Sequence, residues 1–138
     1  MNAAEPGTGQ KQAIEAEDDV VRVRQLVRSV AVATKLSLVD QTKVVTAASE
    51  LARNTLIHGG GGHAEVQVVS DGSRNGVWIR FQDFGPGITD VTQALVDGYT
   101  TGSGLGLGLS GSRRLMDEFQ IETAAGSGTI VTAVKWQR

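Results

Sequence analysis

Three short motifs follow one another along this chain of 138 residues, each in a different kind of segment. The first, ELARN at 50–54, lies where apolar residues recur at helical spacing. The second, DFGPG at 83–87, ends a segment of alternating apolar residues, and the third, GLGLG at 104–108, precedes another helical segment. In one small domain, this order of helix, strand end and glycine loop constrains the fold more than the overall composition does.

The periodicity of apolar residues predicts an α+β fold with helices on one face of a mixed, mostly antiparallel sheet. Asp18 or Asp19 is the predicted cap of the first helix, and Gly59–Gly62 are predicted to end the second. In chain order, the pattern predicts an edge strand at 12–16, helices at about 18–35 and 39–58, strands at 65–70 and 77–83, a short helix at 91–97, a helix at 109–117, and a closing hairpin of strands at 119–123 and 129–136.

Composition indicates a single cytoplasmic domain. Residues 1–9 are polar and glycine-containing and are predicted to form a disordered leader, which leaves 10–138 as the folded domain. A formal net charge of −2 argues against nucleic-acid binding, which needs a basic surface. The sequence shows no signal peptide and no apolar run near the roughly 20 residues of a membrane span, and it has no cysteine, so we expect no membrane partner, disulfide or thiol nucleophile.

Glu50 and Asn54 are four residues apart on a predicted helix and therefore point the same way. An amide oxygen is a hard, neutral ligand suited to Mg²⁺, and a nearby carboxylate can accept a proton from a hydroxyl group. Taken alone, this pair is more simply explained as two polar residues on a solvated helix face.

Asp83 ends a strand whose alternate residues are apolar. A carboxylate in this place can accept a hydrogen bond from an exocyclic amine such as that of adenine, and Gly85 and Gly87 allow a flat base to approach closely. A plain Asp-Gly turn is an equally good explanation of Asp83 by itself.

Alternating glycines at 102, 104, 106 and 108 lead into a helix. Their N–H groups can reach phosphate oxygens, and the helix dipole adds to that attraction. A flexible linker is the simpler alternative, but leucines between the glycines and an amphipathic helix after them favour the phosphate role.

Two literal matches to other motifs fail on their context. Gly106–Gly111 spells the dinucleotide fingerprint but follows a loop, with no acid about 20 residues later. Asp83–Gly85 spells the DFG of protein kinases without their other motifs. His58 and His63 flank the glycine turn, where solvated loop histidines are commoner than metal ligands.

Together the motifs resemble those of the GHKL (Bergerat) ATP-binding fold, a two-layer α/β sandwich, over about 13–138. The resemblance implies ATP and Mg²⁺ as cofactors, with Glu50 as catalytic base, Asn54 as metal ligand and Asp83 as the reader of adenine. It also implies that Thr129 supports Asp83 and that residues 100–108 cover the phosphates. The nucleotide-binding residues implied in this way are Asn54, Asp83, Gly85, Gly87, Thr100, Gly102, Gly104, Leu105, Gly106, Leu107, Gly108 and Thr129.

Within that fold, ELARN, the segment 114–119 and the ending 133–136 are similar to those of the serine/threonine switch kinases of bacterial sigma-factor partner switching. Leu107 departs from that group, which often has a smaller residue there. This resemblance implies that the substrate is a STAS-domain scaffold protein and that the released kinase activates a metal-dependent protein phosphatase.

Three alternatives share the nucleotide site. An anti-sigma factor that also phosphorylates its antagonist has the same fold. A histidine kinase fragment would need a phosphoacceptor helix, and the one helix predicted before Glu50 contains no histidine. A nucleotide-binding module that acts only by docking would use a surface that the motifs do not locate, although Arg113 and Arg114 could belong to it.

Overall fold

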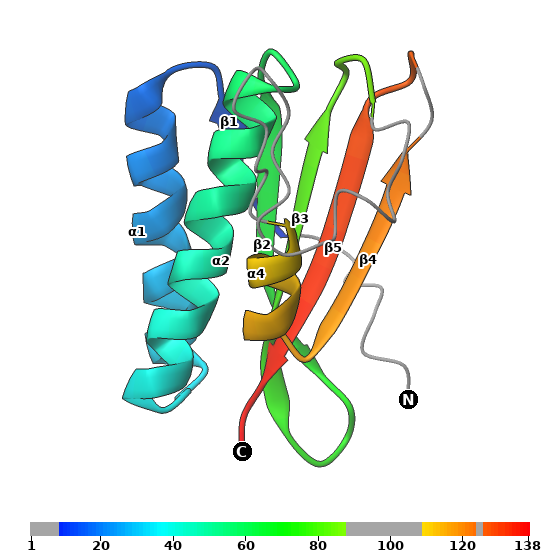
Figure 1. Ribbon diagram of the computed structural model, residues 1–138. Coiled ribbons are helices and arrows are strands. Elements are labelled where there is room, and N and C mark those ends of the chain that lie inside the picture. The colour runs from blue at the N-terminus through cyan, green and yellow to red at the C-terminus, as the bar shows by residue number, and fades with distance from the viewer. Residues whose placement is uncertain (1–8, 88–108, 124–125) are drawn as a thin grey trace.

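The computed structural model describes residues 9–87, 109–123 and 126–138 (Figure 1). Predictions that fall on the leader at 1–8, the short helix at 91–97 and the glycine segment at 100–108 lie outside the described residues. The elements in chain order are β1 (Gln10–Ile14), α1 (Glu17–Ala33), α2 (Leu38–Ile57), β2 (Gly62–Ser70), β3 (Asn75–Asp83), α4 (Leu109–Leu115), β4 (Glu118–Thr123) and β5 (Thr129–Trp136).

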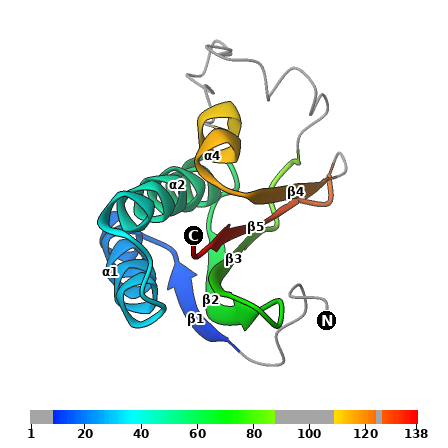
Figure 2. The same ribbon diagram turned by 90° about the horizontal axis from the view of Figure 1, so that it is seen from below.

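The strands form one sheet in the order β1-β2-β3-β5-β4, and every described pair of neighbours is antiparallel. The three helices of the described residues, α1, α2 and α4, lie on one face of this sheet (Figures 1 and 2). The expected α+β architecture is therefore confirmed, and the described residues contain no parallel pair. β5 lies between β3 and β4 in the sheet. Because β3 and β5 are antiparallel, the last residue of β3, Asp83, lies opposite the first residue of β5, Thr129.

The core fills the space between the helices and the sheet, and it is aliphatic apart from Phe81 and Phe119. On β3, Val77, Ile79 and Phe81 point to the helices, as their alternation predicts. The predicted stripes on both long helices are buried: Val20, Val23, Val27, Val30 and Ala31 on α1, and Val44, Ala47, Ala48, Leu51 and Thr55 on α2.

The start of α1 corrects the predicted cap. Ala16 is the N-cap residue and has no side-chain oxygen to offer. Asp19 lies three residues further on, and its carboxylate accepts hydrogen bonds from the N–H groups of Glu15 (2.9 Å) and Ala16 (3.2 Å). Asp19 is therefore not the N-cap but the N3 residue of the helix. Its carboxylate stabilises the turn before the helix, as the acidic residue of a capping box does.

Several other boundaries shift by one to three residues. β1 begins at Gln10 instead of residue 12, and α4 ends at Leu115 instead of 117. The prediction that Gly59–Gly62 end the second helix holds only for the first three of these glycines, because Gly62 already belongs to β2. Among the described helices, none is both long and apolar enough to cross a membrane.

Candidate nucleotide site

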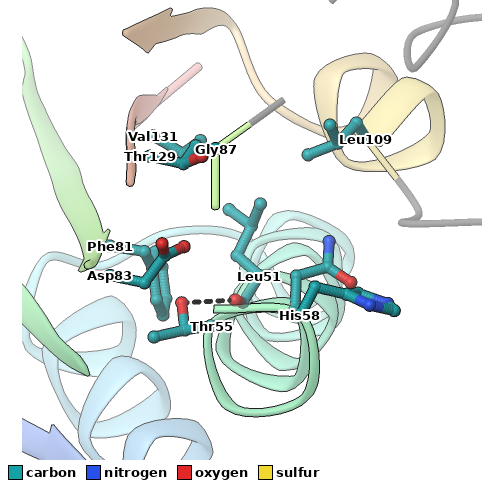
Figure 3. A pocket seen from close by; sticks show the side chains of 10 residues that line it. Leu51, Thr55, His58, Phe81, Asp83, Gly87, Leu109, Thr129 and Val131 are labelled. Carbon is teal, nitrogen blue, oxygen red and sulfur yellow. Dashed lines mark hydrogen bonds between the residues drawn. The ribbon is translucent and has the colours of Figure 1, made fainter. Parts of the chain in front are cut away.

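A pocket opens between the last turns of α2, the adjacent ends of β3 and β5, and the first residue of α4 (Figure 3). It therefore draws its walls from both layers of the fold and from segments far apart in the sequence. The residues that line it are Leu51, Asn54, Thr55, His58, Phe81, Asp83, Gly87, Leu109, Thr129 and Val131.

Asp83 ends β3 inside this pocket. Its Oδ1 accepts a hydrogen bond from the N–H of Gly85 at 3.0 Å, which fixes the turn that follows the strand. Directly opposite on β5 is Thr129, which is nearly buried and shares a 3.0 Å hydrogen bond between hydroxyl groups with Thr123. The carboxylate and the threonine predicted to support it are thus neighbours across the strand pair.

Asn54 and Glu50 occupy different settings on α2. Asn54 is half-buried and lines the pocket. Glu50 lies one turn earlier, is exposed to solvent and is not among the lining residues. The structure therefore brings Asn54, Asp83, Gly87 and Thr129 together around one space and leaves Glu50 at its outer side.

Gly59 is a functional candidate that the sequence analysis overlooked, because it was interpreted only as a helix stop. A Cβ at this position would overlap Cβ and Cγ of Asp83 and lie 2.6 Å from its Oδ2. A Cβ at Gly85 would in turn lie 2.8 Å from the Cα of Gly59. These two glycines let the end of α2 touch the Asp83 turn, and their contact sets where the carboxylate stands.

Gly128, the residue before β5, supports the same turn. Its φ is +83°, a value that favours glycine, and a Cβ there would overlap the carbonyl oxygen of Asp83 and lie 2.9 Å from the Cα of Phe84. A short Gly-Ser-Gly before a threonine is the signal that could have located it. Asp83 is therefore enclosed by backbone on two sides.

His58 also lines the pocket, as the C-cap residue of α2, four residues after Asn54. Burial lowers the pKa of His58, so its imidazole is neutral near pH 7. The two histidines do stand on either side of the glycine turn, but His63 lies within β2 opposite Gln82 and is therefore a strand residue instead of a loop histidine. The described residues contain no group of three or more His, Cys, Asp or Glu side chains able to hold a metal ion.

The chemistry of the pocket fits a purine nucleotide. Apolar side chains of Leu51, Phe81, Val131 and Leu109 provide walls for a flat base, and Asp83 offers one carboxylate to an amine donor. A single amide from Asn54 suits Mg²⁺ that is held mainly by phosphates and water. The phosphate-binding candidates Thr100, Gly102, Gly104, Leu105, Gly106, Leu107 and Gly108 lie outside the described residues.

Comparison with known proteins places the chain in a family. Residues 39–137 match the family of histidine kinase-, DNA gyrase B- and HSP90-like ATPases. The serine/threonine-protein kinase RsbT of Bacillus subtilis is 45% identical over 125 residues, which are 91% of this chain and 94% of that protein. The anti-sigma F factor of Clostridium novyi is 34% identical over 116 residues, 77% of this chain and 81% of that protein.

A solved structure shows the same fold. The RsbU and RsbW domains of Rv1364c from Mycobacterium tuberculosis align with a TM-score of 0.64 at 20% identity, over 94% of this chain and 32% of that longer one.

The chain thus belongs to the histidine kinase-, DNA gyrase B- and HSP90-like ATPase family, and within it to the RsbT group. Its enzyme class is protein serine/threonine kinase, and its nucleotide is ATP.

Proposed function

We propose that this kinase transfers the γ-phosphate of ATP, with Mg²⁺, to a serine or threonine of a STAS-domain protein in a partner-switching module. The observation that carries the proposal is the meeting of Asn54, Asp83 and Thr129 in one pocket with apolar walls. Similarity to RsbT over nearly the whole chain supports the choice of a protein hydroxyl as acceptor.

In this proposal the pocket residues bind different parts of the nucleotide. Asp83 accepts the exocyclic amine of adenine, Thr129 supports that carboxylate, and Gly85 and Gly87 leave room for the base. Asn54 holds the metal ion, and the segment 100–108 covers the phosphates. ATP with Mg²⁺ supplies the activated phosphoryl group and most of the charge neutralisation. The main contribution of the protein is therefore to position the reacting groups.

Glu50 is the proposed general base. It lies one turn before Asn54 and is exposed, so the hydroxyl group of a docked protein can reach it from solvent. Its carboxylate takes the proton of that hydroxyl as the hydroxyl oxygen attacks the γ-phosphorus of ATP. The bond between that phosphorus and the bridging oxygen breaks, and ADP leaves. An exposed base suits a protein substrate, because the pocket itself is occupied by the nucleotide.

Phosphorylation then releases the kinase from its STAS-domain partner, and the free kinase binds and activates a metal-dependent protein phosphatase. This step rests on the resemblance to the switch kinases.

Transfer of radiolabelled γ-phosphate to a purified STAS-domain protein tests the proposal. We expect labelling that needs Mg²⁺ and that falls at least a hundredfold in Glu50→Gln, while this variant keeps its affinity for ATP. An exposed carboxylate in the same helix layer, Glu17, provides the matched control Glu17→Gln. Wild-type labelling by Glu50→Gln would remove Glu50 from the mechanism, and failure to label any STAS-domain protein would contradict the substrate class.

An anti-sigma factor is the second candidate, because anti-sigma F factors at 31–34% identity align over two thirds or more of the chain. Co-purification distinguishes the two functions. Capture of a sigma factor in the absence of a STAS-domain protein would favour the anti-sigma function over the switch kinase.

A further inference from the structure

Exposed apolar side chains gather where α1 ends and α2 begins. Val32, Leu38 and Val39 are 55%, 75% and 64% exposed, although large aliphatic side chains elsewhere in the helix layer are mostly buried. Val32 is in the last turn of α1, and the other two open α2. Such a group of exposed apolar side chains is typical of a place where another molecule docks.

Cations frame this cluster. Arg28 precedes Val32 by four residues on α1, and Lys43 follows Val39 by four on α2, so each shares a helix face with its apolar neighbour. Lys35 is exposed in the turn between them. None of the three takes part in an ion pair within the described residues. The nearest acid in sequence, Asp40, is buried and already faces Lys135 and Arg138.

Lys35 also occupies a backbone conformation that is unfavourable for lysine. Its φ is +63°, the only positive φ of a described non-glycine residue. The N–H of Leu36 bonds to the carbonyl of Ala31 (3.2 Å) and that of Lys35 to Val32 (3.0 Å), the Schellman pattern in which glycine is the usual residue. A lysine in place of glycine at such a site is strained, and strained residues cluster at functional sites.

We infer that Arg28, Val32, Lys35, Leu38, Val39 and Lys43 form a docking surface, the basic–apolar patch, for an amphipathic protein segment that carries acidic side chains. Unpaired cations around exposed aliphatic groups complement a segment with carboxylates beside an apolar stripe. The patch lies at the opposite end of α2 from Asn54 (Figure 1), roughly 24 Å away at 1.5 Å per residue. A partner can therefore dock there while the nucleotide pocket stays accessible.

Other occupants are less well matched. A second copy of the chain placed patch to patch would bring like charges together. Anionic membranes are bound by clusters of about four to eight cations, and the patch has three. An acidic protein segment satisfies both the charge and the apolar area.

The test measures binding of a fluorescein-labelled synthetic helix, with leucines on one face and glutamates beside them, to the full chain by fluorescence anisotropy. We expect Leu38→Ser, Lys43→Glu and Lys35→Gly each to weaken binding about fivefold or more, as the loss of a half-buried contact or a charge pair predicts. The matched controls are Val68→Ser, at an exposed valine of β2, and Lys11→Glu, at an exposed lysine of β1; both should bind like the wild type.

Lys35→Gly separates docking from folding, because it relieves the backbone while it removes the charge. It should weaken binding in a protein that is at least as stable as the wild type. The inference is overturned if the wild type does not bind the helix, if a version with lysine in place of glutamate binds equally well, or if the patch variants bind like the controls. It is also overturned if the same variants instead abolish self-association or binding to anionic vesicles.

Discussion

At the scale of single residues, the position of one carboxylate depends on the absence of side chains around it. Asp83 touches the backbone of Gly59 and Gly128, and each of these glycines leaves no room for a Cβ. A nucleotide pocket needs its polar groups placed to a fraction of an ångström. The glycines of this site therefore act as positioning residues as much as turn formers.

Gly59→Ala tests this idea. The added methyl group must displace Asp83, so we expect ATP affinity to fall about tenfold or more and stability to fall by about 1–3 kcal/mol. Gly111→Ala is the control, since a Cβ there meets nothing within 4 Å in α4. Calorimetric titration with ATP compares the two, and unchanged affinity in Gly59→Ala would show that Asp83 is not held by this contact.

Lys35 is the second residue whose backbone can be tested. Lys35→Gly removes the strain of a left-handed lysine and should raise the free energy of unfolding by about 1 kcal/mol. Lys35→Ala keeps the strained backbone and should give no such gain. Urea denaturation measures both, and equal stability of the two variants would mean that the strain is negligible.

Sequence patterns predicted the polar residues of the site and Gly85, but not Gly59, which holds Asp83 in place. Asp83, Asn54 and Thr129 carry recognisable chemistry, and all three line the pocket. The role of Gly59 depends on a contact between α2 and the end of β3, which no local pattern encodes. Spacing paired Glu50 with Asn54 on one helix face, but it could not show that Glu50 is exposed while Asn54 lines the pocket.

At the scale of elements, the end of β5 ties the two layers together. Lys135 is buried, and its Nζ lies 3.7 Å from Oδ1 of Asp40 on α2 and 3.5 Å from Oδ1 of Asp117 before β4. The N–H of Trp136 donates to Asp117 at 2.7 Å, and Arg138 pairs with both acids. A buried lysine needs such partners, because an unpaired charge in the interior is costly.

This arrangement predicts how stability changes with pH. Burial alone would raise the pKa of Asp117, but the Trp136 N–H and the charges of Arg138 and Lys135 outweigh it and lower that pKa. A lowered pKa means that the folded state favours the carboxylate, so this contribution to stability is present above about pH 4 and is lost as the pH falls below it.

Asp117→Asn should remove that part of the pH dependence. Thermal unfolding of wild type and variant between pH 3 and 7 makes the comparison, with Glu122→Gln, an exposed acid on β4, as the control. We expect the difference in stability between the wild type and Asp117→Asn to shrink at low pH. A difference that stays constant would show that the charge of Asp117 does not stabilise the fold.

Most elements could be predicted from periodicity because their apolar stripes are regular. Both long helices and all five described strands lie within about three residues of their predicted ends, and β1 as a whole begins and ends two residues earlier than predicted. Errors gather at boundaries set by tertiary contacts, such as the start of β2 at Gly62, which pairs with Asp83 across the sheet.

At the scale of the whole molecule, α2 connects two functions at its two ends. Its last turns line the nucleotide pocket, and its first residues belong to the basic–apolar patch. The fold class followed from the order of helices and strands. The patch did not, because exposed valine and leucine at a helix start are indistinguishable by pattern from residues of the core.

Recognition of adenine by Asp83 can be measured by calorimetric titration of the wild type and Asp83→Asn with ATP and with GTP. The wild type should bind ATP and discriminate against GTP, whose base presents a carbonyl instead of an amine at that position. Asp83→Asn should bind ATP about tenfold to a hundredfold more weakly, the range expected for losing a hydrogen bond to a charged group. If Asp83→Asn bound ATP as tightly as the wild type, the carboxylate of Asp83 would not be the group that recognises adenine.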